Sequence, residues 1–155
     1  YEANLALTDE NPPFRFHLSG APIYTRQRFL PATKFLDAKV SRSIVSDGNI
    51  LFGSEVHRSV IGIRSRVQRG AVVRDSYLMG ADYYEDEGSK EHPKIGIGDN
   101  TVIDRAIVDK NARIGKDVVI KNAKNLKDFD GTNHYIRDGI VIIPKNATIK
   151  DGSII

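Results

Sequence analysis

The chain has 155 residues, which is the length of one domain with a substantial core. Hydrophobic residues make up 40% and aromatic residues only 8%, with no Trp and no Cys, so disulfides, thiolate zinc sites and cysteine nucleophiles are excluded. The net charge of +3 is spread along the chain rather than gathered in a basic stripe with stacking aromatics, which argues against a nucleic-acid partner. No run of apolar residues is long enough for a membrane span, and no signal-peptide pattern opens the chain, so no membrane partner is expected.

Residues 1–33 show little of the repeat that follows. Residues 1–7 resemble the tail of an amphipathic helix, Asn11-Pro12-Pro13 is a linker signal, and residues 21–33 form an extended lead-in bounded by prolines. We therefore predict that 1–33 are the end of an upstream domain plus a linker, and that 34–155 form a separate domain. The chain is interpreted as a fragment from the C-terminal side of a larger protein.

Aliphatic side chains recur at six-residue steps in several runs between residue 45 and the end of the chain, with a slip of one at Val108. This period fits neither an α-helix nor a half-buried strand, but it is typical of hexapeptide-repeat parallel β-helices, in which each short face contributes one inward aliphatic residue. An ordinary β-sandwich would show simple alternation instead. The residues on this period are Val45, Leu51, Ile61, Val67, Val73, Ile97, Ile103, Val108, Ile114, Ile120, Ile143, Ile149 and Ile155.

Turn-forming residues separate the aliphatic positions, as in Gly98-Asp99-Asn100 and Asp109-Lys110-Asn111. Gly and Asn tolerate the left-handed backbone that sharp corners require. Three faces of about six residues predict a triangular coil of about eighteen residues. Residues 81–93 and 122–138 interrupt the period and are predicted to be excursion loops thrown out from the solenoid. The acidic run Glu85-Asp86-Glu87 is interpreted as a solvated loop tip.

The four histidines are scattered, and no metal site is expected from His17, His57, His92 and His134. His57 could serve as the base of a hexapeptide-repeat acyltransferase, although no second catalytic residue lies beside it. Two rival functions therefore stay open at this point. One is a β-helical acyltransferase, and the other is a purely structural solenoid.

Several segments of the chain resemble the C-terminal domain of ADP-glucose pyrophosphorylase, also called glucose-1-phosphate adenylyltransferase, and most closely its cyanobacterial and plant branch. The likeness covers nearly the whole chain, including both interruptions. The segments that carry it are APIYTRQRFLP (21–31), VHRSVIGIRS (56–65), MGADYYE (79–85), RAIVDKNARIG (105–115), YIRDGIV (135–141) and KNATI (145–149).

The resemblance implies an all-β, left-handed parallel β-helix that serves tetramer assembly and allosteric control. The parent enzyme makes ADP-glucose and pyrophosphate from ATP and glucose 1-phosphate for glycogen or starch synthesis. Its N-terminal catalytic domain binds ATP and Mg²⁺, so this fragment is expected to hold no catalytic residue or cofactor and to be inactive alone. A cytoplasmic location, or the plastid stroma in a plant, is implied as well.

The resemblance also implies that 3-phosphoglycerate activates the enzyme and orthophosphate inhibits it, in a cleft between the two domains. Carried over by position, the basic residues that contact the activator are Arg28, Lys110 and Lys145. Asp109 and Asp82 are expected as neighbouring polar partners. Arg26 stands where related sequences often carry Gln, and we include it among the candidates.

The spacing of two of these lysines supports an anion site independently. Lys110 follows Val108 by two residues and Lys145 follows Ile143 by two, so both hold the same phase of the repeat. With the 122–138 excursion removed, they lie about one coil apart, and their Cα atoms are expected to be roughly 5 Å apart on adjacent coils. Alternatively, the two side chains splay into solvent, with Asp109 offsetting one charge.

Overall fold

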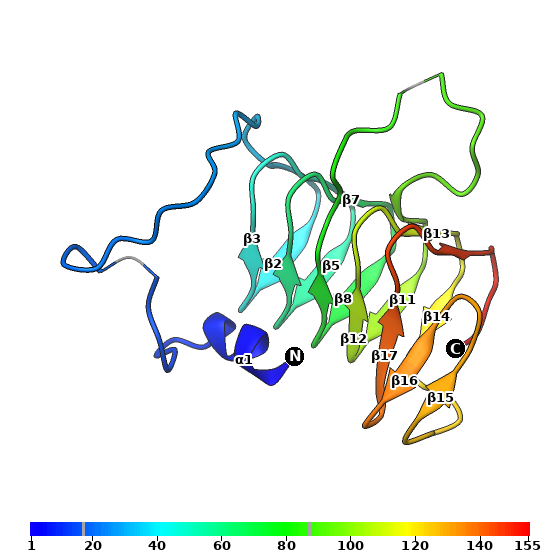
Figure 1. Ribbon diagram of the computed structural model, residues 1–155. Helices are drawn as coiled ribbons and strands as arrows, with labels where there is room; N and C mark the ends of the chain where they lie inside the picture. The colour runs from blue at the N-terminus through cyan, green and yellow to red at the C-terminus, as the bar shows by residue number, and fades with distance from the viewer. Residues whose placement is uncertain (17, 87) are drawn as a thin grey trace.

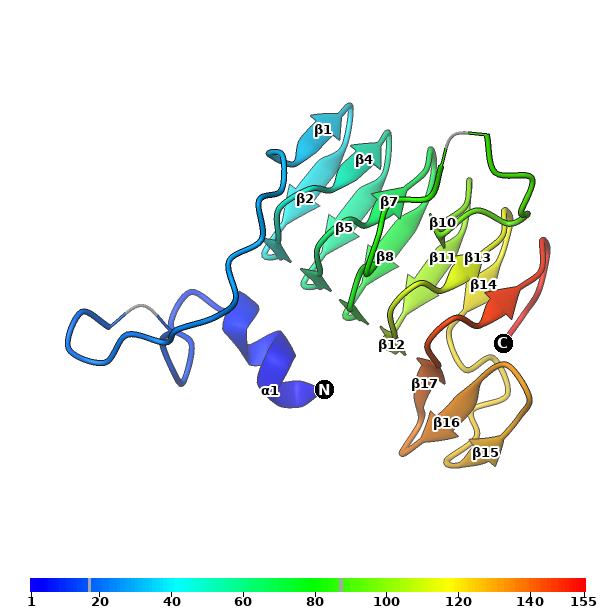
Figure 2. The same ribbon diagram turned by 45° about the horizontal axis from the view of Figure 1, so that its top comes forward.

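The computed structural model describes residues 1–16, 18–86 and 88–155, in which short strands wind into a three-sided parallel β-helix (Figures 1 and 2). Each coil adds one strand to each of three sheets, and within the coils all pairings are parallel. The first sheet, sheet A, runs in the order β1 (Lys34–Leu36), β4 (Ile50–Phe52), β7 (Arg66–Val67), β10 (Gly96–Ile97), β13 (Arg113–Ile114) and β18 (Thr148–Ile149).

The other two faces follow the same rule. Sheet B contains β2 (Lys39–Ser41), β5 (Glu55–His57), β8 (Val72–Arg74), β11 (Val102–Asp104) and β14 (Val119–Ile120). Sheet C contains β3 (Ile44–Val45), β6 (Val60–Ile61), β9 (Tyr77–Leu78), β12 (Ala106–Val108), β17 (Ile140–Ile143), β16 (Tyr135–Arg137) and β15 (Phe129–Asp130). The prediction of an all-β chain folded as a parallel β-helix is confirmed.

The interior is a stack of aliphatic side chains, one from each face of each coil. In sheet A, for example, Leu51 pairs with Val67, and Ile97 pairs with Ile114. Every residue on the predicted period from Leu51 to Ile149 is buried, while Val45 and Ile155 are half-buried against the same core. Burying such a side chain contributes about 1.5–3 kcal/mol, so this column is the main stabilising element of the fold.

The predicted coil length of eighteen residues is wrong. Paired interior residues such as Leu51 and Val67 are sixteen positions apart, and Ile97 and Ile114 are seventeen apart. The difference arises because some faces have five residues and turn at one residue in the left-handed conformation. Arg58 (φ 43°) and Asp75 (φ 44°) occupy two of these tight corners.

Serine hydroxyls accept from backbone N–H groups at the corner between sheets B and C, where Ser59 and Ser76 are buried and Ser43 is half-buried. The Ser59 N–H donates to the Ser43 hydroxyl, and the Ser76 N–H donates to the Ser59 hydroxyl, both at 3.1 Å. The Ala106 N–H continues the ladder to the Ser76 hydroxyl at 3.1 Å. The first four coils are therefore joined at this corner by side-chain hydrogen bonds as well as through the sheets, which helps to fix their stacking register.

The N-terminal segment begins with helix α1 (Glu2–Leu5) and a 3-10 turn (Ala6–Thr8). Leu5 is buried, and the Tyr1 hydroxyl donates to the carbonyl of Asp75, so this turn rests on the solenoid. The lead-in, residues 21–33, is largely exposed and runs along the first coil to the start of β1 (Figure 2). The assignment of 1–33 to the end of an upstream domain stays a prediction.

The two interruptions have different structures. The described residues of 81–93 contain no strand and form a loop between β9 and β10. The prediction of a simple loop for 122–138 is wrong in part, because β15 and β16 add two antiparallel strands to sheet C beyond β17. Asp138 (φ 48°) and Gly139 (φ 79°) form the two-residue turn between β16 and β17, as is common in hairpins.

In the part of the chain that the structure describes, no helix is long and apolar enough to cross a bilayer.

Candidate anion-binding site

The candidate site lies where sheet C turns into sheet A, on the last two coils. Val108 pairs with Ile143 across β12 and β17, and the Asn146 N–H donates to the Lys110 carbonyl at 3.0 Å. Lys110 and Lys145 therefore lie on adjacent coils at the same corner, as their phase in the repeat predicts. The sequence forms this corner because Asn111 (φ 60°) and Asn146 (φ 61°) accept the left-handed conformation.

A single carboxylate bridges the two lysines. Lys110 Nζ lies 3.0 Å from Asp82 Oδ1, and Lys145 Nζ lies 2.7 Å from Asp82 Oδ2. The Asp82 side chain is 34% exposed, so the pairs are open to solvent on one side. The alternative in which both lysines splay freely into solvent is therefore wrong. The interruption at residues 81–93, called the first insertion from here on, supplies the Asp82 carboxylate between them.

Asn111 holds Asp82 in place beneath the lysines. Its Oδ1 accepts from the Asp82 N–H at 2.8 Å, and its Nδ2 lies 3.3 Å from Asp82 Oδ2. The same Nδ2 donates to Asn146 Oδ1 at 3.1 Å. Asn111 is buried, so this amide is a fixed support that joins the insertion to both coils.

The charges at this corner reinforce one another. Hydrogen bonds from Lys145 and Lys110 hold the pKa of Asp82 well below its ordinary value. The Asp82 carboxylate in turn raises the pKa of Lys145. Asp109 lies beside the pair rather than between the lysines, and its Oδ1 accepts from the Lys110 N–H at 2.6 Å. The arrangement directs both ammonium groups at one small anionic group.

The structure does not bring the two candidate arginines to the lysines. Arg26 and Arg28 lie in the exposed lead-in, and neither forms an ion pair with residues 1–16, 18–86 or 88–155. The lead-in does reach the same kind of corner at the N-terminal end of the solenoid, because the Gly48 N–H donates to the Pro31 carbonyl at 2.8 Å. That Arg28 and Arg26 contribute to an anion site stays a prediction.

Glu85 anchors the insertion that carries Asp82. Its carboxylate pairs with Arg113 Nη1 at 2.8 Å and accepts from the Ile95 N–H at 2.9 Å. The side chain of Glu85 is only 10% exposed and that of Arg113 only 17%. Burial opposes the charge on Glu85, but the hydrogen bonds from Ile95 and Arg113 still hold its pKa below the ordinary value.

The interpretation of this acidic run as a solvated loop tip is thus wrong for Glu85. Asp86 is exposed as predicted, and Glu87 lies outside the described residues. Nothing in the local sequence distinguishes Glu85 from its neighbours. Its partner Arg113 follows 28 positions later, and the pairing depends on which way the insertion folds back over sheet A.

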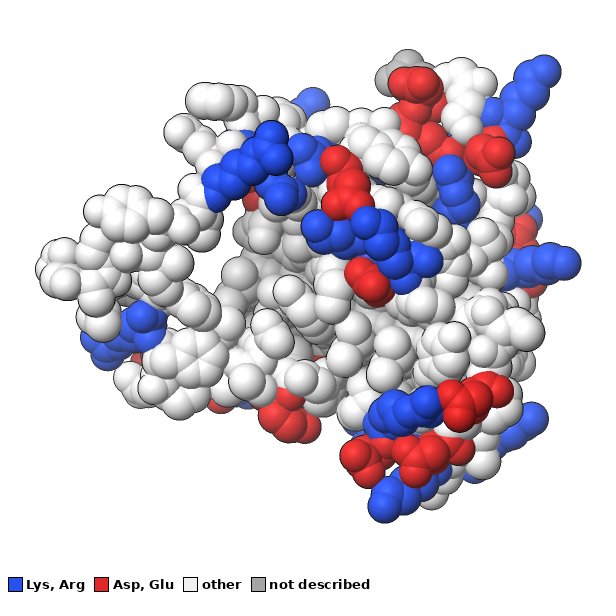
Figure 3. Space-filling view, in the orientation of Figure 1, with Lys and Arg blue, Asp and Glu red and all other residues white. Residues whose placement is uncertain are grey.

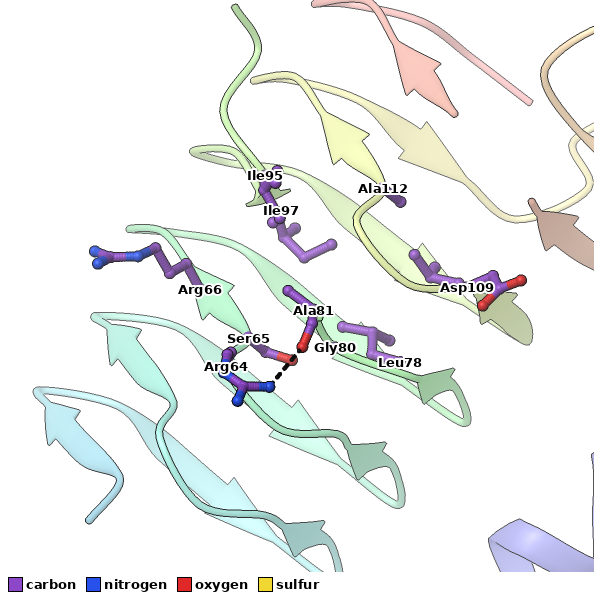
Figure 4. Close-up of a pocket in the computed structure, with 12 residues that line it drawn as sticks. Arg64, Ser65, Arg66, Leu78, Gly80, Ala81, Ile95, Ile97, Asp109 and Ala112 are labelled. Carbon is purple, nitrogen blue, oxygen red and sulfur yellow. Dashed lines mark hydrogen bonds between the residues drawn. The ribbon is translucent and has the colours of Figure 1, made fainter. Parts of the chain in front are cut away.

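A small pocket lies beneath the first insertion, between the coils that flank it (Figure 4). Its lining is mainly apolar, with Leu78, Ile95 and Ile97 among its residues. Arg64 closes one side by donating to the Ala81 carbonyl at 3.2 Å. Arg66 also belongs to the lining, but its side chain points away from Leu78 and Ile97 in Figure 4, so we interpret the pocket as a packing gap beneath the insertion.

The outer surface near these corners carries both signs of charge in close contact (Figure 3). Among the described residues, no three His, Asp or Glu side chains are grouped so that they could hold a metal ion. His57 lies on the outer face of sheet B, where its Nδ1 is 2.9 Å from the Ser41 hydroxyl. Among the described residues, His57 forms no hydrogen bond to a carboxylate that could complete a catalytic triad.

A comparison with protein families adds the handedness of the fold. The family model for the GLGC left-handed parallel β-helix domain matches residues 28–154. The match spans the solenoid, both insertions and the candidate lysines. The predicted left-handed coil is confirmed by it, and with it the predicted family. The chain belongs to the GLGC left-handed parallel β-helix family, the C-terminal domain of ADP-glucose pyrophosphorylase.

Proposed function

We propose that the full-length protein is a glucose-1-phosphate adenylyltransferase and that this domain regulates and assembles it. The parent would convert ATP and glucose 1-phosphate into ADP-glucose and pyrophosphate for glycogen or starch synthesis, in the cytoplasm or a plastid stroma. By the family pattern, ATP and Mg²⁺ would bind in the N-terminal catalytic domain. Family membership supports this proposal.

The allosteric part of the proposal rests on one observation, the convergence of Lys110 and Lys145 on a single anionic group. Two ammonium groups about 5 Å apart repel each other by roughly 3 kcal/mol at an effective dielectric near 20. An anion between them removes this cost and forms charge-assisted hydrogen bonds. A phosphate group fits this arrangement, and by the family pattern the effectors would be 3-phosphoglycerate as activator and orthophosphate as inhibitor.

Other candidates would complete the site in the full-length protein. Arg28, with Arg26 beside it, would reach the anion across the cleft between this domain and the catalytic domain, where a guanidinium can bind phosphate through two parallel hydrogen bonds. Asp109 would orient Lys110 through its contact with the backbone N–H. These assignments follow from the family pattern.

Assembly into a homo-oligomer, a tetramer by family pattern, is proposed from the two ends of the solenoid. On the first coil, interior-facing Phe35 is 51% exposed and Val40 is 37% exposed. At the other end, Ile154 is 72% exposed beside strand β14. End coils with open backbone and apolar groups require caps or partners. Light scattering of the full-length protein should report an oligomer, and a monomer would contradict this part.

Activation curves of the full-length enzyme test the effector site. Lys110→Ala and Lys145→Ala should each raise the 3-phosphoglycerate concentration needed for half-activation by about tenfold, because a charge-assisted contact contributes about 1.5 kcal/mol. Activity without effector should be unchanged. Lys121→Ala, which removes an exposed lysine after β14, is the matched control. Unchanged curves for both site variants would refute the assignment.

Two rival functions make different predictions. A β-helical acyltransferase would show acetyl-CoA-dependent transfer that falls when His57 is replaced. A purely structural solenoid would leave orthophosphate and 3-phosphoglycerate unbound at the lysine corner of the full-length protein. The bridging geometry of the lysines favours the regulatory proposal over both.

A further inference from the structure

Asp82 occupies the position that a bound anion would take. Both of its oxygens are used, one for each lysine, at 3.0 and 2.7 Å. We propose that Asp82 is a built-in competitor, which fills the lysine site when no effector is present and must be displaced when a phosphate binds. This inference rests on the proposed function of the lysine pair, and it adds which class of anion the site accepts.

The formal charges at the corner predict that the site discriminates by ligand charge. Lys110 and Lys145 are balanced by Asp82 and Asp109, so the corner is close to neutral and attracts anions weakly from a distance. Asp82 is also tethered, which gives it a local concentration on the order of millimolar or higher. A free carboxylate can only repeat the contacts that Asp82 already makes, so it cannot compete effectively.

A phosphate group can displace Asp82 because it carries more charge. Near pH 7 a phosphate monoester carries about −1.5 to −2, since its second pKa is about 6, and it offers three oxygens as acceptors. Those oxygens can accept from both lysines at once, with acceptor capacity to spare for a third donor. The geometry therefore selects phosphate monoesters and orthophosphate over monoanionic carboxylates.

The displaced segment would be short, because fixed contacts lie on both sides of Asp82. On one side, the Ala81 N–H donates to the Ile63 carbonyl at 2.9 Å. On the other, the Tyr84 hydroxyl donates to the Gly48 carbonyl at 3.0 Å, and Glu85 is held by Arg113. Only residues 82 and 83 lie between these contacts, and the Asp82 N–H is itself bonded to Asn111 Oδ1, so phosphate binding would turn the Asp82 side chain outward without unfolding the insertion.

Calorimetric titration of the full-length protein with orthophosphate tests the inference. Asp82→Asn keeps the shape of the side chain and removes its charge. The variant should bind orthophosphate about threefold to tenfold more tightly than the unmodified protein, because the bound anion no longer has to break two partly exposed ion pairs. Asp104→Asn, on sheet B, makes the same charge change away from this corner and should leave the affinity within about twofold.

A second probe, acetate, tests the discrimination by charge. The unmodified protein should not bind acetate at millimolar concentration, whereas Asp82→Asn should bind it measurably. Thermal unfolding followed by circular dichroism checks that each variant is folded. If Asp82→Asn fails to fold, Asp82→Ser serves with the same expectations.

The outcomes separate this inference from the proposed function. If Lys110→Ala together with Lys145→Ala abolishes orthophosphate binding but Asp82→Asn binds no more tightly, the competitor role is refuted and the lysine site stands. Weaker binding by Asp82→Asn would also refute it, since Asp82 would then be a support for the lysines. If the double lysine variant binds orthophosphate normally, the proposed site itself fails.

Discussion

The two insertions of the solenoid attach to it by different physical means. The first insertion, 81–93, contains no strand among its described residues and is held by side chains, chiefly the Glu85–Arg113 ion pair and the contacts of Asp82. The second insertion, 122–138, is held by backbone pairing, since β15 and β16 extend sheet C. An element attached by a few charged side chains can respond to an anion, whereas one attached by a sheet responds mainly to loss of backbone hydrogen bonds.

The largest expected effect comes from cutting the anchor of the first insertion. Arg113→Ala should destabilise the protein by about 3 kcal/mol, because it leaves Glu85 buried without its cation and removes the donor to the Pro93 carbonyl. The matched change in the second insertion is Arg137→Ala, whose partner Asp130 is 74% exposed. That variant should cost less than about 1 kcal/mol.

Urea unfolding of the two arginine variants measures the difference directly. Equal losses of unfolding free energy for Arg113→Ala and Arg137→Ala would contradict the claim that the insertions are attached in different ways. A loss of unfolding free energy confined to Arg113→Ala, with faster proteolysis between residues 81 and 93, would support that claim.

A smaller effect is expected at the base of the second insertion. Asn122 Nδ2 donates to the Leu126 and Gly139 carbonyls at 2.8 and 3.1 Å, and its Oδ1 accepts from the Leu126 N–H. Asn122→Ala should cost about 2 kcal/mol through these bonds and through the left-handed backbone (φ 53°). Asn125 shares that conformation (φ 52°), so Asn125→Ala isolates the backbone contribution at about 1 kcal/mol.

Hydrogen exchange shows where the effect of Asn122→Ala lies. Protection should fall at the amides of β15 and β16 and stay unchanged at Asp82. If protection falls equally in both insertions, the two are coupled, and the comparison drawn above is wrong.

The smallest expected effect is a difference between the two insertions in how their stability depends on pH. Burial lowers the pKa of His134, which stacks on Phe129 in the second insertion. The folded protein therefore favours neutral His134. Its contribution to stability is fully present above the pKa of the unfolded state, about 6.5, and is lost as pH falls through the lower pKa of the folded state. For Asp82 and Glu85 the pKa is also lowered, and their contribution is lost only as pH falls below about 4.

Amide protection factors, corrected for intrinsic exchange, should thus fall in the second insertion between pH 6.5 and 5 while the first insertion stays protected. The Gly131 amide, which donates to the His134 carbonyl, and the Asp82 amide are suitable reporters. His134→Gln should remove the response of the second insertion. Loss of protection at both sites in the same pH range would contradict the assignment.

The sequence predicted the core because its physics is local and repeated. A branched aliphatic residue at each six-residue step can be buried in only one way once the chain coils, and Ile103, Ile114 and Ile149 all follow that rule. A uniform six-residue step overestimates the coil length, because one left-handed residue, such as Arg58, shortens a face to five residues. The hairpin at Asp138-Gly139 did carry a signal, since Asp-Gly between apolar strands is typical of two-residue turns.

The candidate site was predictable only in part. Lys110 and Lys145 could be aligned because they share a phase of the repeat, and repeat phase determines position on the solenoid. The bridging role of Asp82 could not be predicted from phase, because its insertion leaves the repeat and its path depends on Glu85 meeting Arg113. Residues outside a periodic scaffold are placed by tertiary contacts that have no sequence period.

A crystal structure of the full-length protein soaked in orthophosphate would test the central claim most directly. The account predicts a phosphate between Lys110 Nζ and Lys145 Nζ, within hydrogen-bonding distance of both, and the Asp82 carboxylate turned away from them. Phosphate bound only elsewhere, with Asp82 still bridging the two lysines, would contradict it.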